Sequence, residues 1–240
     1  MATDLVSTEP ATGREIWHGQ SGNVDETVER ARVAMRSWAR EPLGRRIELM
    51  RRFANQVRKH SETFAELIAR EPGKPLWEAR TEVEAVIGKV EISIKAYAER
   101  TGQRKLDSAL RGTAALRHKP HGVMAVLGPY NFPAHLPNGH IIPALIAGNG
   151  VVFKPSEKTP ATGEMLVELL HQSGIPEEVI RLVSGGPAQG RVEHGTVLGR
   201  VQVRPGEHLR EALGDAGLLG QLDKRGEDLV ADEVLRQVDV

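Results

Sequence analysis

The sequence contains no cysteine and few aromatic residues. Cysteine is absent from all 240 residues, and Phe, Trp and Tyr together contribute only 4%. The absence of cysteine excludes disulfide bonds, thiolate metal sites and a cysteine nucleophile within this sequence. It says little about the cellular compartment beyond agreeing with a reducing one.

Neither sign of charge is in excess, and long apolar runs are missing. Lys and Arg together number 32, and so do Asp and Glu. A basic surface that would attract nucleic acid or an anionic membrane is therefore not expected. No apolar run approaches the length that spans a bilayer, and the first residues, MATDLVSTEPATG, lack the basic and apolar regions of an export signal. We expect a cytoplasmic protein with no nucleic-acid or membrane partner.

The first part of the sequence has a helical pattern. With 40% hydrophobic residues, a chain of this length can bury a substantial core. Apolar residues recur at helical intervals over residues 24–100. We predict one helix that ends near Trp38, a second from Pro42 to the EPGKP segment at 71–75, and a third that begins near Leu76.

The period changes after residue 122. Three short apolar segments, VMAVLG (123–128), GVVFKPSE (150–157) and VIRLVSG (179–185), are predicted to be buried strands, and the segments between them to be helices. Thr159 is the predicted N-cap of the second of these helices, and Gly174 its predicted end. This order favours parallel strands joined by right-handed crossovers. The predicted fold class is therefore α/β, with N-terminal helices followed by an incomplete Rossmann-like parallel sheet.

The last fifty residues, 191–240, have a different composition. They contain no Phe, Tyr, Trp, Ile, Met, Ser or Asn. One helix is possible over residues 209–238, but four glycines within it weaken that prediction.

The residues that follow the first two strands are the first to consider for chemistry, because ligands of open α/β sheets bind beyond the carboxyl ends of the strands. Lys154 and Glu157 could bind the two hydroxyls of a ribose, since an ammonium donates hydrogen bonds and a carboxylate accepts them. They could equally be ordinary loop charges. The side-chain amide of Asn131 could donate to an oxyanion, or Asn131 could be a simple cap or turn residue.

Two other features give weaker signals. His135 and His140 lack the partners and spacing of a metal site, so we expect no metal. The GGPAQG segment at 185–190 does not match a dinucleotide-binding glycine motif, and we interpret it as a turn.

Two segments resemble a known family. VLGPYNFPAHLPNGHIIPALIAGNGVVFKPSEKTP resembles the coenzyme-binding region of the NAD-dependent aldehyde dehydrogenase superfamily, and EPGKPLWEARTEVEAVIGKVEISIKAYAERTG resembles the helix that leads into it. The similarity extends from Ser7 to Gly186. It implies NAD as the cofactor and a small acidic aldehyde as the substrate.

The resemblance also implies roles for individual residues. Asn131 matches the amide that stabilises the oxyanion. Lys154 and Glu157 match the pair that holds the adenosine ribose, and Glu157 would favour NAD by repelling a 2'-phosphate. The other cofactor contacts implied are Leu127, Gly128, Pro129 and Tyr130, and the residues implied to line the aldehyde tunnel are Phe132, His135 and Leu136. Strand sequence at 112–122 would lie near the family's oligomerisation region, so we expect a homo-oligomer or association through exposed sheet edges.

The sequence departs from the family where catalysis would begin. In the family, a cysteine thiolate attacks the aldehyde and a Glu base activates water, but this sequence has no cysteine and neither the Glu motif nor the F-T-G-S turn that receives the pyrophosphate. We therefore expect a partial coenzyme-binding domain at 1–187, truncated or frame-shifted after about residue 187, with a divergent tail at 188–240. We expect the chain to be catalytically inactive. The alternatives are a non-catalytic NAD-binding or subunit-interaction module and a non-functional pseudogene product.

Overall fold

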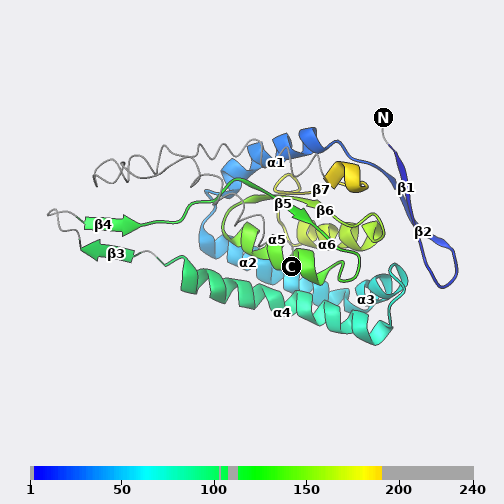
Figure 1. The fold of residues 1–240 in the computed structure, drawn as a ribbon. Coiled ribbons are helices and arrows are strands. Elements are labelled where there is room, and N and C mark those ends of the chain that lie inside the picture. Colours follow the sequence, from blue (N-terminus) through cyan, green and yellow to red (C-terminus); the bar gives the residue numbers. More distant parts are fainter. Residues whose placement is uncertain (1–2, 103, 108–112, 191–240) are drawn as a thin grey trace, which may run out of the picture. The chain divides into compact units, whose positions relative to one another are not determined.

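The computed structural model describes residues 3–102, 104–107 and 113–190, and contains helices and three small sheets within them (Figure 1). The elements are β1 (Asp4–Thr8), β2 (Glu15–Gln20), α1 (Val24–Trp38), α2 (Leu43–Lys59), α3 (Ser61–Arg70), α4 (Leu76–Arg100), β3 (Arg104–Asp107), β4 (Thr113–Leu116), β5 (Val123–Leu127), α5 (His135–Ile146), β6 (Gly150–Lys154), α6 (Pro160–Gln172) and β7 (Ile180–Leu182).

The central sheet has the order β5-β6-β7, and all of its strands are parallel (Figure 1). Val126 pairs with Phe153 across β5 and β6, and Phe153 pairs with Leu182 across β6 and β7. The helices α5 and α6 connect consecutive strands, as two parallel crossovers require. The predicted α/β fold class with a Rossmann-like parallel sheet is confirmed.

The two faces of this sheet pack against different helices. Val152, on β6, belongs to a small apolar cluster with Val24, Val28 and Ala31, so that α1 covers this face. The neighbouring Phe153 points to the opposite face and joins the large cluster that α2 to α6 form. Because both faces are covered, every residue of β6 is buried.

A buried arginine connects the ends of two helices. The side chain of Arg46, in α2, is 7% exposed and donates to the main-chain oxygens of Ile146 at 2.9 Å and Glu41 at 2.6 Å. Longer hydrogen bonds reach the oxygens of Trp38 and Ala39, at 3.5 and 3.4 Å. These carbonyls lie at or just beyond the carboxyl ends of α1 and α5, where helix dipoles favour a cation.

The single helix predicted between Pro42 and EPGKP is wrong, because the structure has two helices there. The first ends at Lys59, and the next residue, His60, leaves the helical region with a φ of −108° and a ψ of 16°. The ring Nδ1 of His60 lies 3.0 Å from the main-chain oxygen of Gln56, at the end of α2. Val57 and Phe64 are both fully buried on either side of the break. The apolar period therefore continues across it, and no glycine or proline marks it in the sequence.

The N-terminal hairpin of β1 and β2 was not predicted. The two strands pair antiparallel, and the hairpin is held to the body by an ion pair of 2.8 Å between Arg70 and Glu9 and by a hydrogen bond from Trp17 Nε1 to Glu164. Most of its residues are exposed or half-buried, so the sequence shows no clear apolar alternation there.

A second hairpin lies at the predicted strand arm of residues 112–122. Strand covers only Thr113–Leu116 of that range, and β3, which pairs with it antiparallel, was not predicted. Within the described residues, neither strand pairs with the central sheet. The composition-based predictions for residues 191–240 lie outside the described residues. None of the helices in the described ranges has the length and hydropathy of a membrane span.

Candidate functional site

The carboxyl ends of β5 and β6 lie side by side and bring the predicted residues together. Leu127 pairs with Lys154, and the amide of Gly128 donates to the oxygen of Lys154 at 2.8 Å. A Cβ on Gly128 would lie 2.9 Å from the ring of Phe153, so only glycine lets the chain leave β5 at this point. The loops that carry Asn131 and Glu157 therefore start from adjacent positions at one edge of the sheet.

Lys154 and Glu157 form a donor and acceptor pair at this edge. Lys154 Nζ lies 3.8 Å from Glu157 Oε2 and donates to the oxygen of Pro155 at 2.9 Å. The Lys154 side chain is 7% exposed, whereas that of Glu157 is 41% exposed. The ammonium is thus fixed in the fold while the carboxylate faces solvent. An ammonium and a carboxylate at this separation can bind two adjacent hydroxyls, because the ammonium donates hydrogen bonds and the carboxylate accepts them.

Four large apolar side chains are exposed at the end of β5 and in the residues that follow it. We call them the edge residues: Leu127, Tyr130, Phe132 and Leu136, which are 36% to 53% exposed. All four are among the residues predicted to contact cofactor or substrate. Lys158 Nζ lies 4.8 Å from the centroid of the Tyr130 ring, a cation–π contact that holds this ring at the edge. Flat apolar surface of this kind can pack against the ring of a ligand.

Asn131 lies in the loop before α5, which agrees with the turn position that the sequence allowed. The helix begins four residues later, at His135. The main-chain oxygen of Asn131 accepts a hydrogen bond of 3.2 Å from Lys74 Nζ. The same ammonium lies 4.7 Å from the centroid of the Phe132 ring. The loop is therefore anchored through its main chain and one ring, and the Asn131 side chain is in an exposed residue.

Three residues next to the site were missed by the sequence reasoning. Glu71 accepts hydrogen bonds at the N-terminus of α6, Glu82 does so at the N-terminus of α5, and Lys74 pairs with Glu82. Thr159 occupies the N-cap position of α6 as predicted, but among the described residues its hydroxyl has no hydrogen-bond partner and does not cap the helix. One signal was available. Glu82 falls at the same helical interval as the buried Ala79 and Val86, and a carboxylate on an apolar stripe needs a buried partner.

Burial raises the pKa of the Glu71 carboxyl, and the hydrogen bonds from Thr162 and Ala161 oppose that effect. Glu71 is 2% exposed, and no ion pair of its carboxylate is found among the described residues. Its charge is stabilised instead by main-chain and hydroxyl donors at the positive end of a helix dipole.

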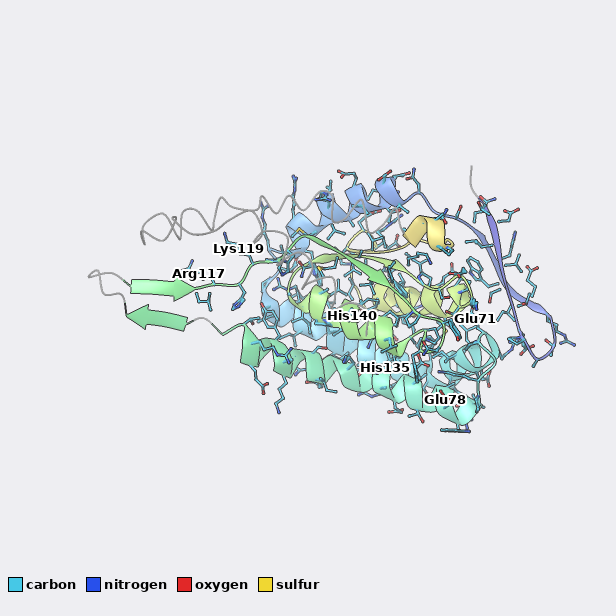
Figure 2. The ribbon with its side chains drawn as sticks, viewed as in Figure 1. Glu71, Glu78, Arg117, Lys119, His135 and His140 are labelled. Atoms are coloured by element: carbon cyan, nitrogen blue, oxygen red, sulfur yellow. The ribbon has the colours of Figure 1, made fainter. Side chains whose placement is uncertain are left out.

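The two histidines of the region lie on α5, where Figure 2 labels His135 at the start and His140 further along. The main-chain amide of His135 donates to Glu82, and its buried ring Nδ1 has no partner among the residues that the structure covers. In the ranges that the structure covers, no group of three or more His, Asp or Glu side chains could hold a metal. The expectation of no metal remains a prediction.

The GGPAQG segment is more than the predicted turn. Residues 187–190 are helical, and the amide of Gly186 donates to Gln189 Oε1 at 3.0 Å. Gly190 approaches the side chain of Lys154, because a Cβ built on Gly190 would lie 3.5 Å from its Cδ and Cε. The chain after β7 thus packs against the lysine of the donor and acceptor pair.

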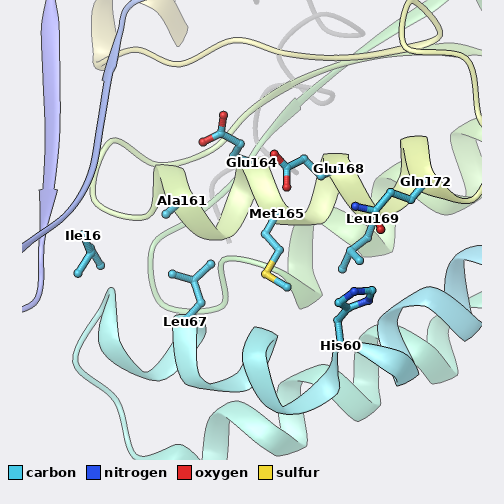
Figure 3. Close-up of a pocket in the computed structure, with 9 residues that line it drawn as sticks. All are labelled: Ile16, His60, Leu67, Ala161, Glu164, Met165, Glu168, Leu169 and Gln172. Carbon is cyan, nitrogen blue, oxygen red and sulfur yellow. The ribbon is translucent and has the colours of Figure 1, made fainter.

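A pocket of about 370 Å³ lies elsewhere, between α3 and α6 (Figure 3). Leu67, Met165 and Leu169 line its apolar part, and Glu164 and Glu168 lie at its polar side. None of the predicted site residues lines it. We therefore place the candidate site at the carboxyl edge of the sheet.

Comparison with known sequences gives one family. The aldehyde dehydrogenase family matches residues 2–194. The N-succinylglutamate 5-semialdehyde dehydrogenase of Novosphingobium aromaticivorans is 69% identical over 188 residues, which cover 78% of this chain and 40% of that protein. The enzyme of the same name from Paraburkholderia xenovorans is 53% identical over 184 residues, covering 75% of this chain and 38% of that protein. The chain thus spans about 40% of the length of these curated relatives.

Comparison with solved structures gives the same kind of protein. An NAD-dependent benzaldehyde dehydrogenase from Corynebacterium glutamicum superposes with a TM-score of 0.74 at 27% identity, covering 80% of this chain and 43% of that one. An NADP-dependent enzyme from E. coli superposes with a TM-score of 0.75 at 28% identity, covering 80% and 40%. One of these proteins is named for NAD and the other for NADP, so both cofactors occur among proteins with this fold.

Proposed function

Because the chain belongs to the aldehyde dehydrogenase family, we propose that its described residues form the coenzyme-binding part of an N-succinylglutamate 5-semialdehyde dehydrogenase. The parent reaction would convert N-succinylglutamate 5-semialdehyde, NAD and water to N-succinylglutamate and NADH, a step of arginine catabolism in the cytoplasm. In domain terms, residues 1–187 would be this coenzyme-binding part, and residues 188–240 would be a divergent tail.

The pair of Lys154 and Glu157 supports this proposal most directly. Its ammonium is buried and its carboxylate, 3.8 Å away, faces solvent. In the bound state, the ammonium donates to one ribose hydroxyl and the carboxylate accepts from the other. A 2'-phosphate would place negative charge against Glu157, so this pair favours NAD over NADP. Leu127, Gly128, Pro129 and Tyr130 would supply the remaining surface on the β5 side of the edge.

The proposed role of Asn131 is to donate its side-chain amide to an oxyanion of the aldehyde, with Phe132, His135 and Leu136 lining the approach. NAD, when bound, supplies the hydride acceptor. The chain has no thiol that could form the covalent bond to the aldehyde carbon on which the family's reaction depends. We therefore propose that the 240-residue polypeptide binds cofactor weakly and does not oxidise aldehydes by itself.

Two measurements on the purified chain test this proposal. Calorimetric titration should show binding of NAD that is at least about tenfold tighter than that of NADP, as expected for one unfavourable charge contact. Incubation with N-succinylglutamate 5-semialdehyde and NAD should give no NADH absorbance above that of a heat-denatured sample. Steady NADH production by the homogeneous chain would refute the proposed inactivity, and equal affinity for the two cofactors would refute the role of Glu157.

A second candidate function is association with other subunits. Within the described residues, β5 and β7 each pair only with β6, so both outer edges of the central sheet lack a strand partner. Unpaired edges are templates for strand addition. We propose that the chain forms a homo-oligomer or associates through these edges. Size-exclusion chromatography with light scattering should then give a mass above 26.3 kDa, whereas a stable monomer would contradict this candidate.

A further inference from the structure

Two carboxylates from one short segment reach the two helices that follow the site loops. Glu71 directly follows α3, Glu82 lies in the second turn of α4, and Lys74 lies between them in the connection. The helix α6 follows the loop that carries Glu157, and α5 follows the loop that carries Asn131. Figure 2 labels Glu71 and Glu78 where the chain passes from α3 into α4.

Glu71 fixes the loop after β6. Its two carboxylate oxygens accept from the amide of Ala161 at 2.8 Å, the amide of Thr162 at 2.7 Å and the hydroxyl of Thr162 at 2.6 Å. These donors lie in the first turn of α6, directly after the loop of residues 155–159. The N-cap hydroxyl of Thr159 has no partner within the part of the chain that the structure describes, so Glu71 supplies the acceptors that a local cap usually supplies.

Glu82 and Lys74 fix the loop after β5. Glu82 Oε1 accepts from the amides of Ala134 and His135, both at 2.9 Å, and its other oxygen forms an ion pair with Lys74. The Glu82 side chain is fully buried and that of Lys74 is 10% exposed. The same ammonium contacts the Asn131 oxygen and the Phe132 ring. Residues on both sides of Pro133 are therefore held by one buried ion pair.

We propose that residues 71–82 are a positioning segment, in which Glu71 sets the loop of the ribose-binding pair and the Lys74–Glu82 pair independently sets the loop of Asn131. This inference rests on the proposed function and deepens it. The three residues touch neither cofactor nor substrate, so they are positioning residues and not catalytic ones. Because each carboxylate contacts only one of the two loops, loss of either should disturb one half of the site and leave the other in place.

The test is a crossed comparison of Glu71→Ala and Glu82→Ala in the isotope-labelled full chain. Amide hydrogen exchange measures whether each helix N-terminus is still held. In Glu82→Ala, the amides of Ala134 and His135 should exchange about tenfold faster or more, and those of Ala161 and Thr162 should not change. In Glu71→Ala, the pattern should be reversed. Tenfold is the change expected when one hydrogen bond of ordinary net strength is lost.

The dissociation constant of 5'-AMP is a second measurement, and a general loss of stability would not change it in one variant more than in the other. The dissociation constant of 5'-AMP should rise about threefold or more in Glu71→Ala, which loosens the loop of the ribose-binding pair. In Glu82→Ala and in Lys74→Met, which act on the other loop, it should rise by less than in Glu71→Ala, because the ribose-binding pair keeps its position. Lys95→Met, a change at an exposed lysine of the same helix α4, is the matched control and should alter neither reading.

Folding is checked by circular dichroism at the temperature of the experiment. If an alanine variant unfolds, Glu71→Gln or Glu82→Gln replaces it; because glutamine keeps the shape and one acceptor oxygen but loses the charge, the same crossed pattern is expected with a smaller change in exchange. Faster exchange at both helix N-termini in both variants, or at neither, would overturn the inference. Failure of the wild-type chain to bind 5'-AMP would instead refute the proposed function, because the exchange pattern does not depend on a ligand.

Discussion

The interior of the fold and the carboxyl edge of its sheet place similar residues in opposite surroundings. Phe153 and Leu127 lie on neighbouring strands, and yet Phe153 is fully buried whereas Leu127 is 52% exposed. Inside, apolar side chains are covered by helices on both faces of the sheet. The edge residues expose apolar surface to solvent, although polar side chains at these positions would be solvated more favourably. Stability and ligand binding should therefore depend on different residues.

The largest expected effect is in the interior. Phe153→Ala removes a ring that packs between Gly128 and Gly163, and it leaves a cavity that these glycines cannot fill. We expect a loss of about 3–5 kcal/mol in the free energy of unfolding, measured by urea denaturation. Leu127→Ala, at the exposed end of β5, is the control. A similar loss of unfolding free energy in both variants would show that stability does not depend more on the interior than on the edge.

The next effect concerns the buried arginine. Arg46→Met keeps the apolar stem but leaves the carbonyls at the ends of α1 and α5 without their donor, and we expect a loss of about 2–3 kcal/mol in the same measurement. Arg52, on the same helix, forms an exposed ion pair with Glu48. Arg52→Met should therefore change the unfolding free energy within experimental error. If Arg46→Met also leaves the free energy of unfolding unchanged, the arginine does not stabilise the ends of these helices.

A smaller effect is the pH dependence that Glu71 contributes. Because burial raises the pKa of Glu71 in the folded state, the native protein binds more protons than the unfolded chain above the ordinary value of 4.5. This contribution to stability is fully present below pH 4.5 and is lost as the pH rises through the folded pKa. Glu71→Gln removes it. The free energy of unfolding of the variant should therefore change less with pH in this range than that of the wild type. The same pH dependence in both proteins would contradict the raised pKa of Glu71.

The smallest effect on stability is expected at the edge. Leu127→Ser should change the free energy of unfolding by no more than about 0.5 kcal/mol, since its side chain is half exposed. It should still weaken NAD binding, because it removes apolar surface beside the donor and acceptor pair. Calorimetry and urea denaturation of the same variant measure the two quantities. A large loss of stability with unchanged binding would reverse the roles assigned to edge and interior.

The sequence predicted the parts of the fold that local patterns determine. The segments around Val152 and Leu166 have the apolar patterns of a buried strand and a helix, because both faces of the sheet are covered. Gly174 follows the second of these with a positive φ of 99°, as a residue that ends a helix often does. The break at His60 was missed because buried apolar residues continue across it. The hairpin of β1 and β2 was missed because its residues are too exposed to alternate clearly.

The site was only partly accessible to sequence reasoning. Lys154 and Glu157 could be placed because they are three residues apart and follow a recognisable strand. The positioning segment could not, because Glu82 lies 52 residues from Ala134 and Glu71 lies 90 residues from Ala161. No local pattern encodes contacts of that separation. They arise only when the α3–α4 connection packs beside both crossover helices.

The most direct test of the account is an NMR titration of the labelled chain with NAD, in the wild type and in Glu157→Ala. We expect shifts confined to the amides around Gly128, Lys154 and Glu157, and an affinity reduced about tenfold in the variant because a hydrogen bond to a charged group is lost. Shifts that map to the pocket between α3 and α6, or an affinity that is the same in both proteins, would contradict it.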